Sequence, residues 1–437
     1  MSRSLNVGKN QHWQWSQDEQ QIVWLTFDKQ EDSVNTLSID AMKELRGKLE
    51  KIKQNKPSAL VIQSGKPGGF IAGAEIKEFE QFKEPSDAEH TIQAGQAVFD
   101  LLAELPFPTI AAINGFCVGG GLELSLACRY RIALDAPNTR LGLPEVQLGI
   151  HPGWGGTVRL PKLIGIPAGM DLILSGKMIS AQTAKRLKVV DCVVPERQFK
   201  RVIEHYAIHQ PAIQKAHWIN KILSISYVRP LLANWIRKKL KKKIMQGHYP
   251  APYAVVDNWE QYGLMQKAYQ VEANSVAQFI SSATAQNLVR IFFLKERLKT
   301  LGKKAKKHCF SKVHVIGAGV MGGDIAAWCA LQGMMVTLED KNPFAVAQTL
   351  KRAKKLFERR LKSFHLVQAA TDRLIPDEAG HGLKNAEFVI EAVVEKVEVK
   401  RAVFAELEQR VLPETILATN TSTIPLEEIR SALKEPE

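Results

Sequence analysis

The pattern of apolar and polar residues predicts strands, loops and helices in alternation at two places in the chain. At the first, an apolar run at 59–62 predicts a buried strand, and the small residues of segment 69–77 follow where that strand gives way to loop. A second apolar run ends at Ile113 and leads through a glycine turn into a helical pattern that reaches Cys128. This region therefore predicts an α/β fold.

The second place begins at Lys312. The run 313–316 predicts a strand, the apolar positions of 325–331 recur with helical spacing, and 335–339 predict another strand. Further strands are predicted at 388–395 and 416–422, on either side of a charged amphipathic helix near 396–410. Since the intervening stretch predicts helices, we expect three parts in an α/β protein: domains at 1–195 and 312–437, joined by a helical linker at 196–311.

Two glutamates in glycine-rich sequence are the first candidates for chemistry. Glycines at a helix start allow the backbone to approach a ligand and direct unpaired N–H groups at an oxygen, and Glu123 lies in the first turn of that helix, where the helix dipole favours a carboxylate. Glu145 follows Pro144 in an otherwise apolar segment, where burial would raise its pKa and keep some of the acid form near neutral pH. These residues predict a pocket for acid/base chemistry beside a carbonyl.

The segments around 69–77, 113–128 and 141–149, with His151–Pro161 after them, resemble the crotonase (enoyl-CoA hydratase/isomerase) superfamily from about Trp24 to Val194. The resemblance implies a crotonase-like domain that binds an acyl-CoA substrate and forms 3-hydroxyacyl-CoA by hydration of a trans-2-enoyl-CoA in fatty acid beta-oxidation, a hydro-lyase reaction. Glu75 stands where aspartate is commoner, and this departure leaves the N–H of Ala74 unaffected.

The resemblance also implies roles for single residues. The N–H groups of Ala74 and Gly120 would form an oxyanion hole for the thioester carbonyl. Glu123 would hold and activate the water that adds at C3, while Glu145 would exchange the proton at C2. The remaining expected substrate-binding residues of this domain are Ala72 and Gly153.

A glycine loop opens the second α/β region. Gly317, Gly319 and Gly322 form a G-x-G-x-x-G motif that follows a predicted strand and opens a helix, so a pyrophosphate is expected at the helix N-terminus, beside Val320 and Met321. Asp340 ends the next predicted strand, where an acid binds the ribose hydroxyls and favours NAD over NADP; Glu339 is the alternative ribose ligand.

This region resembles the NAD-binding domain of 3-hydroxyacyl-CoA dehydrogenases, a partial Rossmann fold. The resemblance implies that Glu395 and Lys400 lie near the nicotinamide and substrate, that Asn420 belongs to the NAD site and that Ser422 contacts substrate. The open alternative for Glu395 and Lys400 is a solvated helix start.

The sequence to Glu437 holds no His-Phe-Phe-Asn-Pro segment, which carries the general base in the dehydrogenase family. His365 and His381 lie outside any matching motif, and we expect them at the surface. We therefore expect an NAD-binding fold with little or no dehydrogenase activity in this polypeptide alone, as in a chain cut short.

The order of crotonase region, helices and Rossmann region resembles the alpha subunits of multifunctional fatty acid oxidation complexes, which have a comparable Tyr-Pro-Ala-Pro turn to that at 249–252. That resemblance implies an oligomer and a thiolase beta subunit as partner.

Composition and charge exclude some other classes. The five cysteines form no C-x-x-C pair, which suits a cytoplasmic protein and argues against a metal site. The sequence has no long uncharged apolar run and Met1–Gly8 lacks the apolar core of a signal peptide, so we expect neither a membrane span nor a signal peptide. The net charge of +14, with basic runs at 237–243 and 303–307, would attract the phosphates of CoA and NAD or allow peripheral contact with anionic lipid. No nucleic-acid-reading module is recognised.

Two hypotheses remain open at this point. One is an enoyl-CoA hydratase, with a delta3-delta2-enoyl-CoA isomerase as a close alternative because isomerisation needs chiefly one carboxylate. The other is a non-catalytic acyl-CoA- and NAD-binding fragment of a split or decayed multifunctional protein. Intact Glu123 and Glu145 favour the enzyme.

Overall fold

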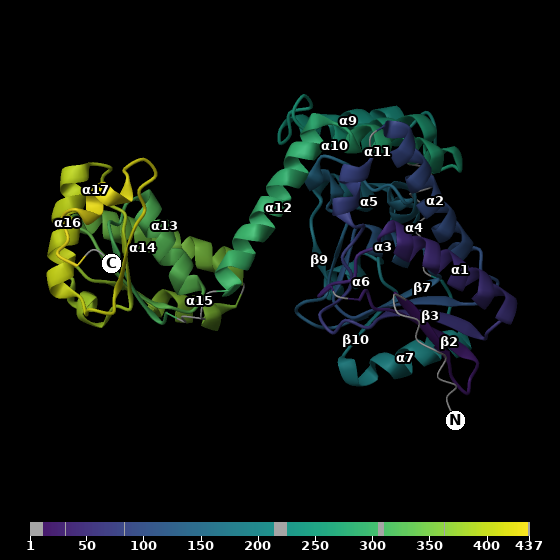
Figure 1. Cartoon of the computed structure of the whole chain (residues 1–437), viewed down its shortest axis with the longest axis horizontal. Helices are drawn as coiled ribbons and strands as arrows, with labels where there is room; N and C mark the ends of the chain where they lie inside the picture. The colour runs from purple at the N-terminus through teal and green to yellow at the C-terminus, as the bar shows by residue number, and fades with distance from the viewer. Residues whose placement is uncertain are drawn as a thin grey trace. The chain divides into compact units, whose positions relative to one another are not determined.

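The computed structural model describes residues 12–30, 32–82, 84–213, 225–304, 310–361 and 363–435. The chain forms two compact units, residues 1–299 and 300–437, which are described separately (Figure 1). Segment Met1–Gly8 and part of the basic run 303–307 lie outside the described residues.

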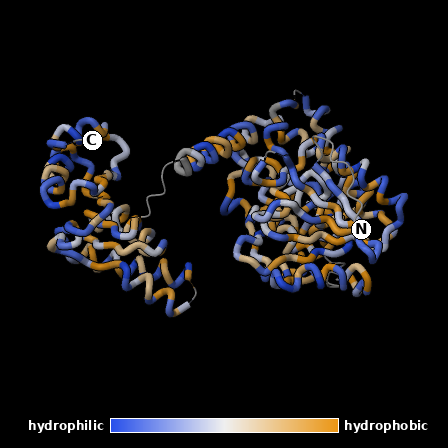
Figure 2. Tube along the Cα trace, turned by 60° about the horizontal axis from the view of Figure 1, so that its bottom comes forward, coloured by the Kyte–Doolittle hydropathy of each residue, from blue (hydrophilic) through white to orange (hydrophobic). Residues whose placement is uncertain are grey.

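The first unit is built on a six-stranded sheet with the order β1-β2-β3-β5-β7-β10, in which every neighbouring pair is parallel except β1 and β2. Its strands are β1 (Trp13–Gln17), β2 (Ile22–Phe27), β3 (Ala59–Ser64), β5 (Thr109–Ile113), β7 (Tyr130–Leu134) and β10 (Cys192–Val194). The apolar run predicted as a buried strand is β3, whose first four residues are buried. In Figure 2 the apolar colours are concentrated inside this unit.

A smaller four-stranded sheet has the order β4-β6-β8-β9. It consists of β4 (Gly69–Ile71), β6 (Phe116–Val118), β8 (Arg140–Gly142) and β9 (Ile179–Ser180). The glycine-rich segments follow β4, β6 and β8 directly. Because these three strands run parallel, the segments emerge at one edge of the sheet.

Helices surround the two sheets. They are α1 (Ile39–Asn55), η1 (Ile76–Gln81), α2 (Pro85–Ala103), α3 (Gly120–Ala127), η2 (Glu145–Leu148), α4 (Gly156–Ile164), α5 (Ile166–Ser175), α6 (Ala181–Arg186) and α7 (Glu196–His209). The hydroxyl of Ser38 caps α1 by accepting the N–H of Ala41, and Leu45, Leu49 and Ile52 form its buried stripe.

The stretch expected to be helical contains α9 (Arg229–Lys241), α10 (Ala251–Tyr262), α11 (Lys267–Ile280) and α12 (Ala283–Lys304). Residues 196–299 belong to the first compact unit. Helices α9, α10 and α11 lie together at one end of that unit (Figure 1), where Val276 and Ile280 of α11 join an apolar cluster with Ala88 and Ile92 of α2. Helix α11 therefore forms part of the wall around the glycine-rich segments.

The second unit has five parallel strands in the order β13-β12-β11-β14-β15. The strands are β11 (Lys312–Ile316), β12 (Met335–Glu339), β13 (Leu374–Pro376), β14 (Phe388–Glu391) and β15 (Ile416–Thr419). The helices are α13 (Val320–Leu331), α14 (Pro343–Leu361), α15 (Phe364–Asp372), η3 (His381–Asn385), α16 (Val397–Arg410) and α17 (Leu426–Arg430). This is the doubly wound arrangement expected of a dinucleotide-binding fold.

Two strands of this unit are shorter than predicted. The prediction of a strand at 388–395 is wrong beyond Glu391, because the Glu391 carboxylate turns back to accept the N–H of Val393 and the chain then bends into α16. The prediction for 416–422 is wrong beyond Thr419, where the Thr419 hydroxyl accepts the N–H of Thr421. Side-chain bonds to the backbone thus end both strands early.

Candidate active site

Two backbone N–H groups face the same space at the edge of the smaller sheet. Ala74 follows Gly73, which has φ +107°, and Gly120 follows Gly119, which has φ +54°; these left-handed conformations are ones that glycine adopts readily. A Cβ on Gly120 would lie 3.5 Å from the nitrogen of Ala74, so the two groups are near neighbours. Neither N–H donates a hydrogen bond to another described residue. The pair can therefore receive an oxygen from a ligand.

The loop that carries Ala74 is held from behind by the buried Asn35. Its side-chain amide donates to the carbonyl oxygens of Phe27 (2.8 Å) and Phe70 (3.2 Å), and its backbone carbonyl accepts the N–H of Ala72 (2.8 Å). These bonds fix the strand end from which Ala74 projects.

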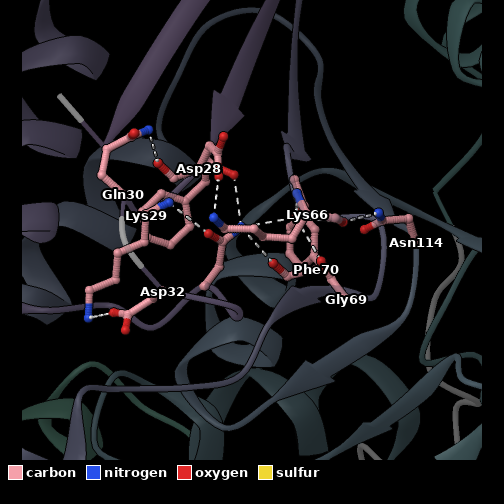
Figure 3. Close-up of polar contacts among 11 residues, drawn as sticks. Asp28, Lys29, Gln30, Asp32, Lys66, Gly69, Phe70 and Asn114 are labelled. Carbon is pink, nitrogen blue, oxygen red and sulfur yellow. Dashed lines mark hydrogen bonds and ion pairs between the residues drawn. The ribbon is translucent and has the colours of Figure 1, made fainter.

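A charged network continues beside this loop (Figure 3). Lys66 pairs with Asp28 at 2.7 Å, and its carbonyl accepts from Asn114 at 2.9 Å. Lys29 pairs with Asp32 at 2.8 Å. Lys29 also pairs with Glu75, at 2.7 Å. The carboxylate of Glu75 is therefore engaged by Lys29 and by the hydroxyl of Thr36.

Glu123 is 2% exposed and lies in the first turn of α3, as predicted. Its Oε1 accepts the N–H groups of Trp154 and Gly156, each at 2.8 Å, and no described residue hydrogen-bonds its Oε2. Burial and the charges of Glu145 and Glu272 raise the pKa of Glu123 well above its usual value, while the two N–H bonds lower it.

Glu145 begins η2, directly after Pro144. Its Oε2 is shielded from solvent and accepts no hydrogen bond from the described residues. Burial raises the pKa of Glu145 to about 8, and the charge of Glu272 adds to the effect. A carboxyl group with this pKa is largely protonated at neutral pH; the sequence predicted that burial would keep some of the acid form there.

A third buried carboxylate, Glu272 on α11, was not foreseen from the sequence. It is 1% exposed and accepts the N–H groups of Gly155 (2.5 Å) and Thr157 (2.9 Å) and the Thr157 hydroxyl. Burial raises its pKa to about 7, opposed by these hydrogen bonds. Its sequence signal is a glutamate within the buried stripe of an amphipathic helix, beside Ala273 and Val276.

The indole of Trp154, quoted in the sequence only as part of the segment His151–Pro161, packs between α2 and α3. A Cβ on Gly95 would lie 2.3 Å from its Nε1, and one on Gly120 would lie 2.4 Å from its Cζ3. The ring meets Phe99 edge to face with centroids 5.6 Å apart. Glycine is required on both helices because the indole fills the space of any side chain there.

One cavity of about 860 Å³ is lined by the residues of the N–H pair, by Glu123 and Glu145 and by Trp154. The structure brings six predicted site residues to it: Ala72, Ala74, Gly120, Glu123, Glu145 and Gly153. Apolar side chains including Ile92, Val98 and Val276 form much of the wall, and Lys43 and Arg46 contribute positive charge. A polar end with two N–H groups and carboxylates beside an apolar chamber suits an acyl thioester.

In the second unit, the glycine loop has the shape that a pyrophosphate requires. Gly317 has φ +103°, and a Cβ on Gly322 would lie 1.9 Å from the carbonyl oxygen of Gly317, so helix and loop are in close contact. A Cβ on Gly319 would meet nothing within 4 Å, and the adjacent Val320 and Met321 are exposed. The N-terminus of α13 is therefore open to a ligand.

Of the two acidic candidates for the ribose, Asp340 lies against the glycine loop, since its Oδ2 accepts the N–H of Ala318 at 2.6 Å. Glu339 is engaged elsewhere, with its Oε2 3.1 Å from Nε2 of the buried His314. This arrangement favours Asp340 as the ribose ligand.

The alternative of a solvated helix start for Lys400 is wrong, because Lys400 is 1% exposed and its Nζ lies 2.7 Å from Oε1 of the fully buried Glu391. Lys400 also lies 3.2 Å from Glu395, whose pKa is lowered to about 2 by hydrogen bonds from Thr421 and Lys400. Glu391 as the partner of Lys400 was not foreseen.

The last two predicted residues of the NAD unit lie beside this pair. Ser422 donates its N–H to Glu395 at 3.2 Å, and Asn420 donates its N–H to the carbonyl of Glu391 at 2.8 Å. The structure therefore brings Glu395, Lys400, Asn420 and Ser422 together at the carboxyl ends of β14 and β15. Ligands bind at this edge in doubly wound sheets.

Other groups were expected to have no part in the site. His365 and His381 are exposed, as predicted. In the part of the chain that the structure describes, no cluster of three His, Cys, Asp or Glu residues is arranged to hold a metal ion. None of the described helices is long and apolar enough to cross a membrane.

The two largely parallel sheets, the paired N–H groups and the two carboxylates in one cavity define the first unit as a crotonase-type domain. The model of the enoyl-CoA hydratase/isomerase family matches residues 17–248, more than half of the chain, and the chain belongs to that family. The second unit matches the 3-hydroxyacyl-CoA dehydrogenase NAD-binding domain over residues 312–437, which makes NAD its cofactor.

Among similar proteins are two named fatty acid oxidation complex subunit alpha. The protein from Vibrio campbellii is 37% identical over 435 residues, and the match covers 96% of this chain and 61% of the relative. The protein from Aliivibrio fischeri is 36% identical, and the match covers 97% of this chain and 63% of the relative. The chain thus spans about three fifths of the length of these relatives. A solved structure, human mitochondrial delta3-delta2-enoyl-CoA isomerase, is 26% identical with a TM-score of 0.49, covering 68% of this chain and 100% of its own.

Proposed function

We propose that the first unit hydrates trans-2-enoyl-CoA to 3-hydroxyacyl-CoA. The observation that carries this proposal is the single cavity in which the N–H groups of Ala74 and Gly120 meet the carboxyl groups of Glu123 and Glu145. The family match supports the same reaction class. The proposal covers the hydration step; the CoA portion of the substrate would meet the positive charge of Lys43 and Arg46.

The oxyanion hole provides the first part of the mechanism. The thioester oxygen accepts hydrogen bonds from Ala74 and Gly120, which stabilise the negative charge that the oxygen gains as water adds at C3. The helix dipole of α3 contributes to the same stabilisation, since Gly120 is its first residue.

The two glutamates then divide the proton transfers. Glu123 acts as the base in its ionised form, which two N–H donors stabilise against the opposing effect of burial. It takes a proton from the water as the water oxygen bonds to C3. The electron pair of the C2–C3 double bond moves toward the thioester, and C2 takes the proton that Glu145 carries. The product holds OH at C3 and H at C2, and the proton on Glu123 must return to Glu145 before the next cycle.

The NAD unit fits its cofactor. The open N-terminus of α13 would take the pyrophosphate and Asp340 the ribose, while Glu395, Lys400, Asn420 and Ser422 would lie near the nicotinamide and substrate. When bound, NAD supplies a hydride acceptor. We also propose a thiolase beta subunit as partner, an oligomeric state and a cytoplasmic location. Co-purification with a thiolase followed by gel filtration tests the partner and the assembly.

The test of the hydration proposal compares the wild type with Glu123→Gln and Glu145→Gln, using a short trans-2-enoyl-CoA and the 3-enoyl isomer. Loss of hydration in both variants is the expected result. If Glu123→Gln keeps full activity on the 3-enoyl substrate and the wild type does not hydrate, the protein is an isomerase. A wild type that binds acyl-CoA without turnover would indicate a scaffold. Asp257→Asn, an exposed carboxylate on α10 paired with Arg237, is the control and should be fully active.

A further inference from the structure

Four consecutive N–H groups at residues 154–157 alternate between two buried carboxylates. The first and third, of Trp154 and Gly156, donate to Oε1 of Glu123, each at 2.8 Å. The second and fourth, of Gly155 and Thr157, donate to Glu272 at 2.5 and 2.9 Å. One short segment is thus held from opposite sides by α3 and α11.

This segment is the N-terminus of α4, which explains why it accepts two negative charges. Its N–H groups have no acceptor within the helix, and the positive end of the helix dipole favours carboxylates. Gly155, with φ +96°, turns the backbone so that successive N–H groups point in different directions. The space is also closed: a Cβ on Gly156 would lie 2.8 Å from Oε1 of Glu123.

A glutamine ties the same segment to two helices. Gln96 of α2, 6% exposed, donates from Nε2 to the carbonyl oxygens of Gly153 and Tyr269, both at 2.9 Å, and lies 3.4 Å from Oε1 of Glu272. Helix α11 therefore contacts the site through segment 154–157, whose N–H groups donate to Glu272 of α11 and also to Glu123. No alternative acceptor among the described residues takes the N–H groups of Gly155 and Thr157.

We propose that Glu272 is a positioning residue for hydration: it fixes the start of α4, and through it the orientation of the Glu123 carboxylate, from a helix outside the expected hydratase domain. This inference rests on the proposed function. Glu272 touches neither the reacting atoms nor the oxyanion N–H groups. It acts through the 154–157 backbone, in addition to the charge by which it raises the pKa of Glu123 and Glu145. Without it, two N–H groups and the Thr157 hydroxyl would lack an acceptor in a closed space, and the segment would shift until they found one.

The effect is expected in turnover rather than in substrate binding. Glu272→Gln keeps one acceptor oxygen but replaces the other with an NH₂ group, which faces N–H and O–H donors of Gly155 and Thr157. Segment 154–157 should therefore move, and the Glu123 carboxylate should move with it. We expect kcat to fall by about 10- to 100-fold, because a displacement of about 1 Å at a catalytic group costs that much, while KM stays within about twofold. Glu272→Asp, which keeps both acceptor oxygens, should recover part of kcat.

Two further variants separate this contact from general damage. Asn274→Ala removes another α11–α2 hydrogen bond, to Glu89 at 3.1 Å, that does not reach the segment, and it should leave kcat unchanged. Thr157→Val removes only the hydroxyl donor. In the double variant with Glu272→Gln, kcat should fall by less than the product of the two separate factors, since both substitutions act on one contact.

Hydrogen exchange gives a readout that needs no turnover. Amides of 153–158 should exchange faster in Glu272→Gln than in the wild type, with 109–118 unchanged. If Glu272→Gln has the kcat of the wild type, or if exchange at 153–158 is unchanged, the inference is overturned. Neither result would contradict the proposed hydration reaction. A wild type that does not hydrate would overturn the proposed function, while the exchange measurement would still decide whether Glu272 holds the segment.

Discussion

Replacing Glu145 by glutamine should abolish hydration and yet stabilise the first unit at neutral pH. Burial raises the pKa of Glu145 from 4.5 to about 8, so the folded protein holds a proton that the unfolded chain releases. The free energy of unfolding contributed by this group is complete below pH 4.5 and is lost as the pH rises toward 8. Glutamine resembles the protonated acid and does not titrate, so the variant avoids this loss.

The magnitude follows from the shift. Each pH unit between the two pKa values costs about 1.4 kcal/mol, so from pH 5 to pH 7 the wild type should lose about 3 kcal/mol relative to Glu145→Gln. Over the same range, kcat for hydration should be about 10²- to 10⁴-fold lower in the variant, because C2 has no proton donor. Wild-type hydration should decline above about pH 8, where Glu145 gives up its proton.

The assay is urea unfolding at several pH values. The unfolding is monitored by hydrogen exchange of peptides from residues 109–160, so that the NAD unit does not contribute. Glu75→Gln is the matched control with the opposite sign. Burial opposes ionisation of Glu75, but hydrogen bonds from Lys29 and Thr36 prevail and lower its pKa, so its contribution to stability is present above pH 4.5 and is lost on acidification. A difference between Glu145→Gln and wild type that stays constant from pH 5 to pH 7 would refute the reasoning.

Three other substitutions test separate parts of the structure. Gly120→Ala would place a Cβ 2.4 Å from the Trp154 ring, and it should lower stability by about 1–3 kcal/mol and hydration with it, as thermal unfolding and the enoyl-CoA assay would show. Gly322→Ala would force a Cβ to within 1.9 Å of a loop carbonyl and should abolish NAD binding in calorimetry while hydration continues; retained binding would contradict the close fit. Lys400→Met leaves Glu391 buried without its cation and should destabilise the NAD unit by about 3–5 kcal/mol in urea unfolding, whereas an unchanged midpoint would show that the pair contributes nothing.

The secondary structure around the sites was largely predictable because it follows from short-range pattern. The strand predicted at 335–339 has those bounds, since apolar residues stand at Met335, Val336 and Leu338. The ends of β14 and β15 were missed because a buried glutamate and a threonine bond back to the backbone, which no periodicity reveals.

The candidate site was predictable where its residues form a motif. Glu123 and Glu145 lie in glycine-rich segments that follow parallel strands, and such segments meet at one sheet edge. Glu272 belongs to no motif and reaches the site only because α11 packs on α2, a tertiary contact. Its one signal was a charged residue inside a buried helical stripe, which burial makes costly unless hydrogen bonds compensate.

Hydration of an enoyl thioester in this cavity requires both glutamates. The most direct measurement follows the enoyl absorbance of a short trans-2-enoyl-CoA with the wild type, Glu123→Gln and Glu145→Gln at one enzyme concentration. The absorbance should fall to the hydration equilibrium with the wild type and should not fall above background with either variant. Hydration that persists in either variant, or a folded wild type that leaves the absorbance unchanged, would contradict the proposed mechanism.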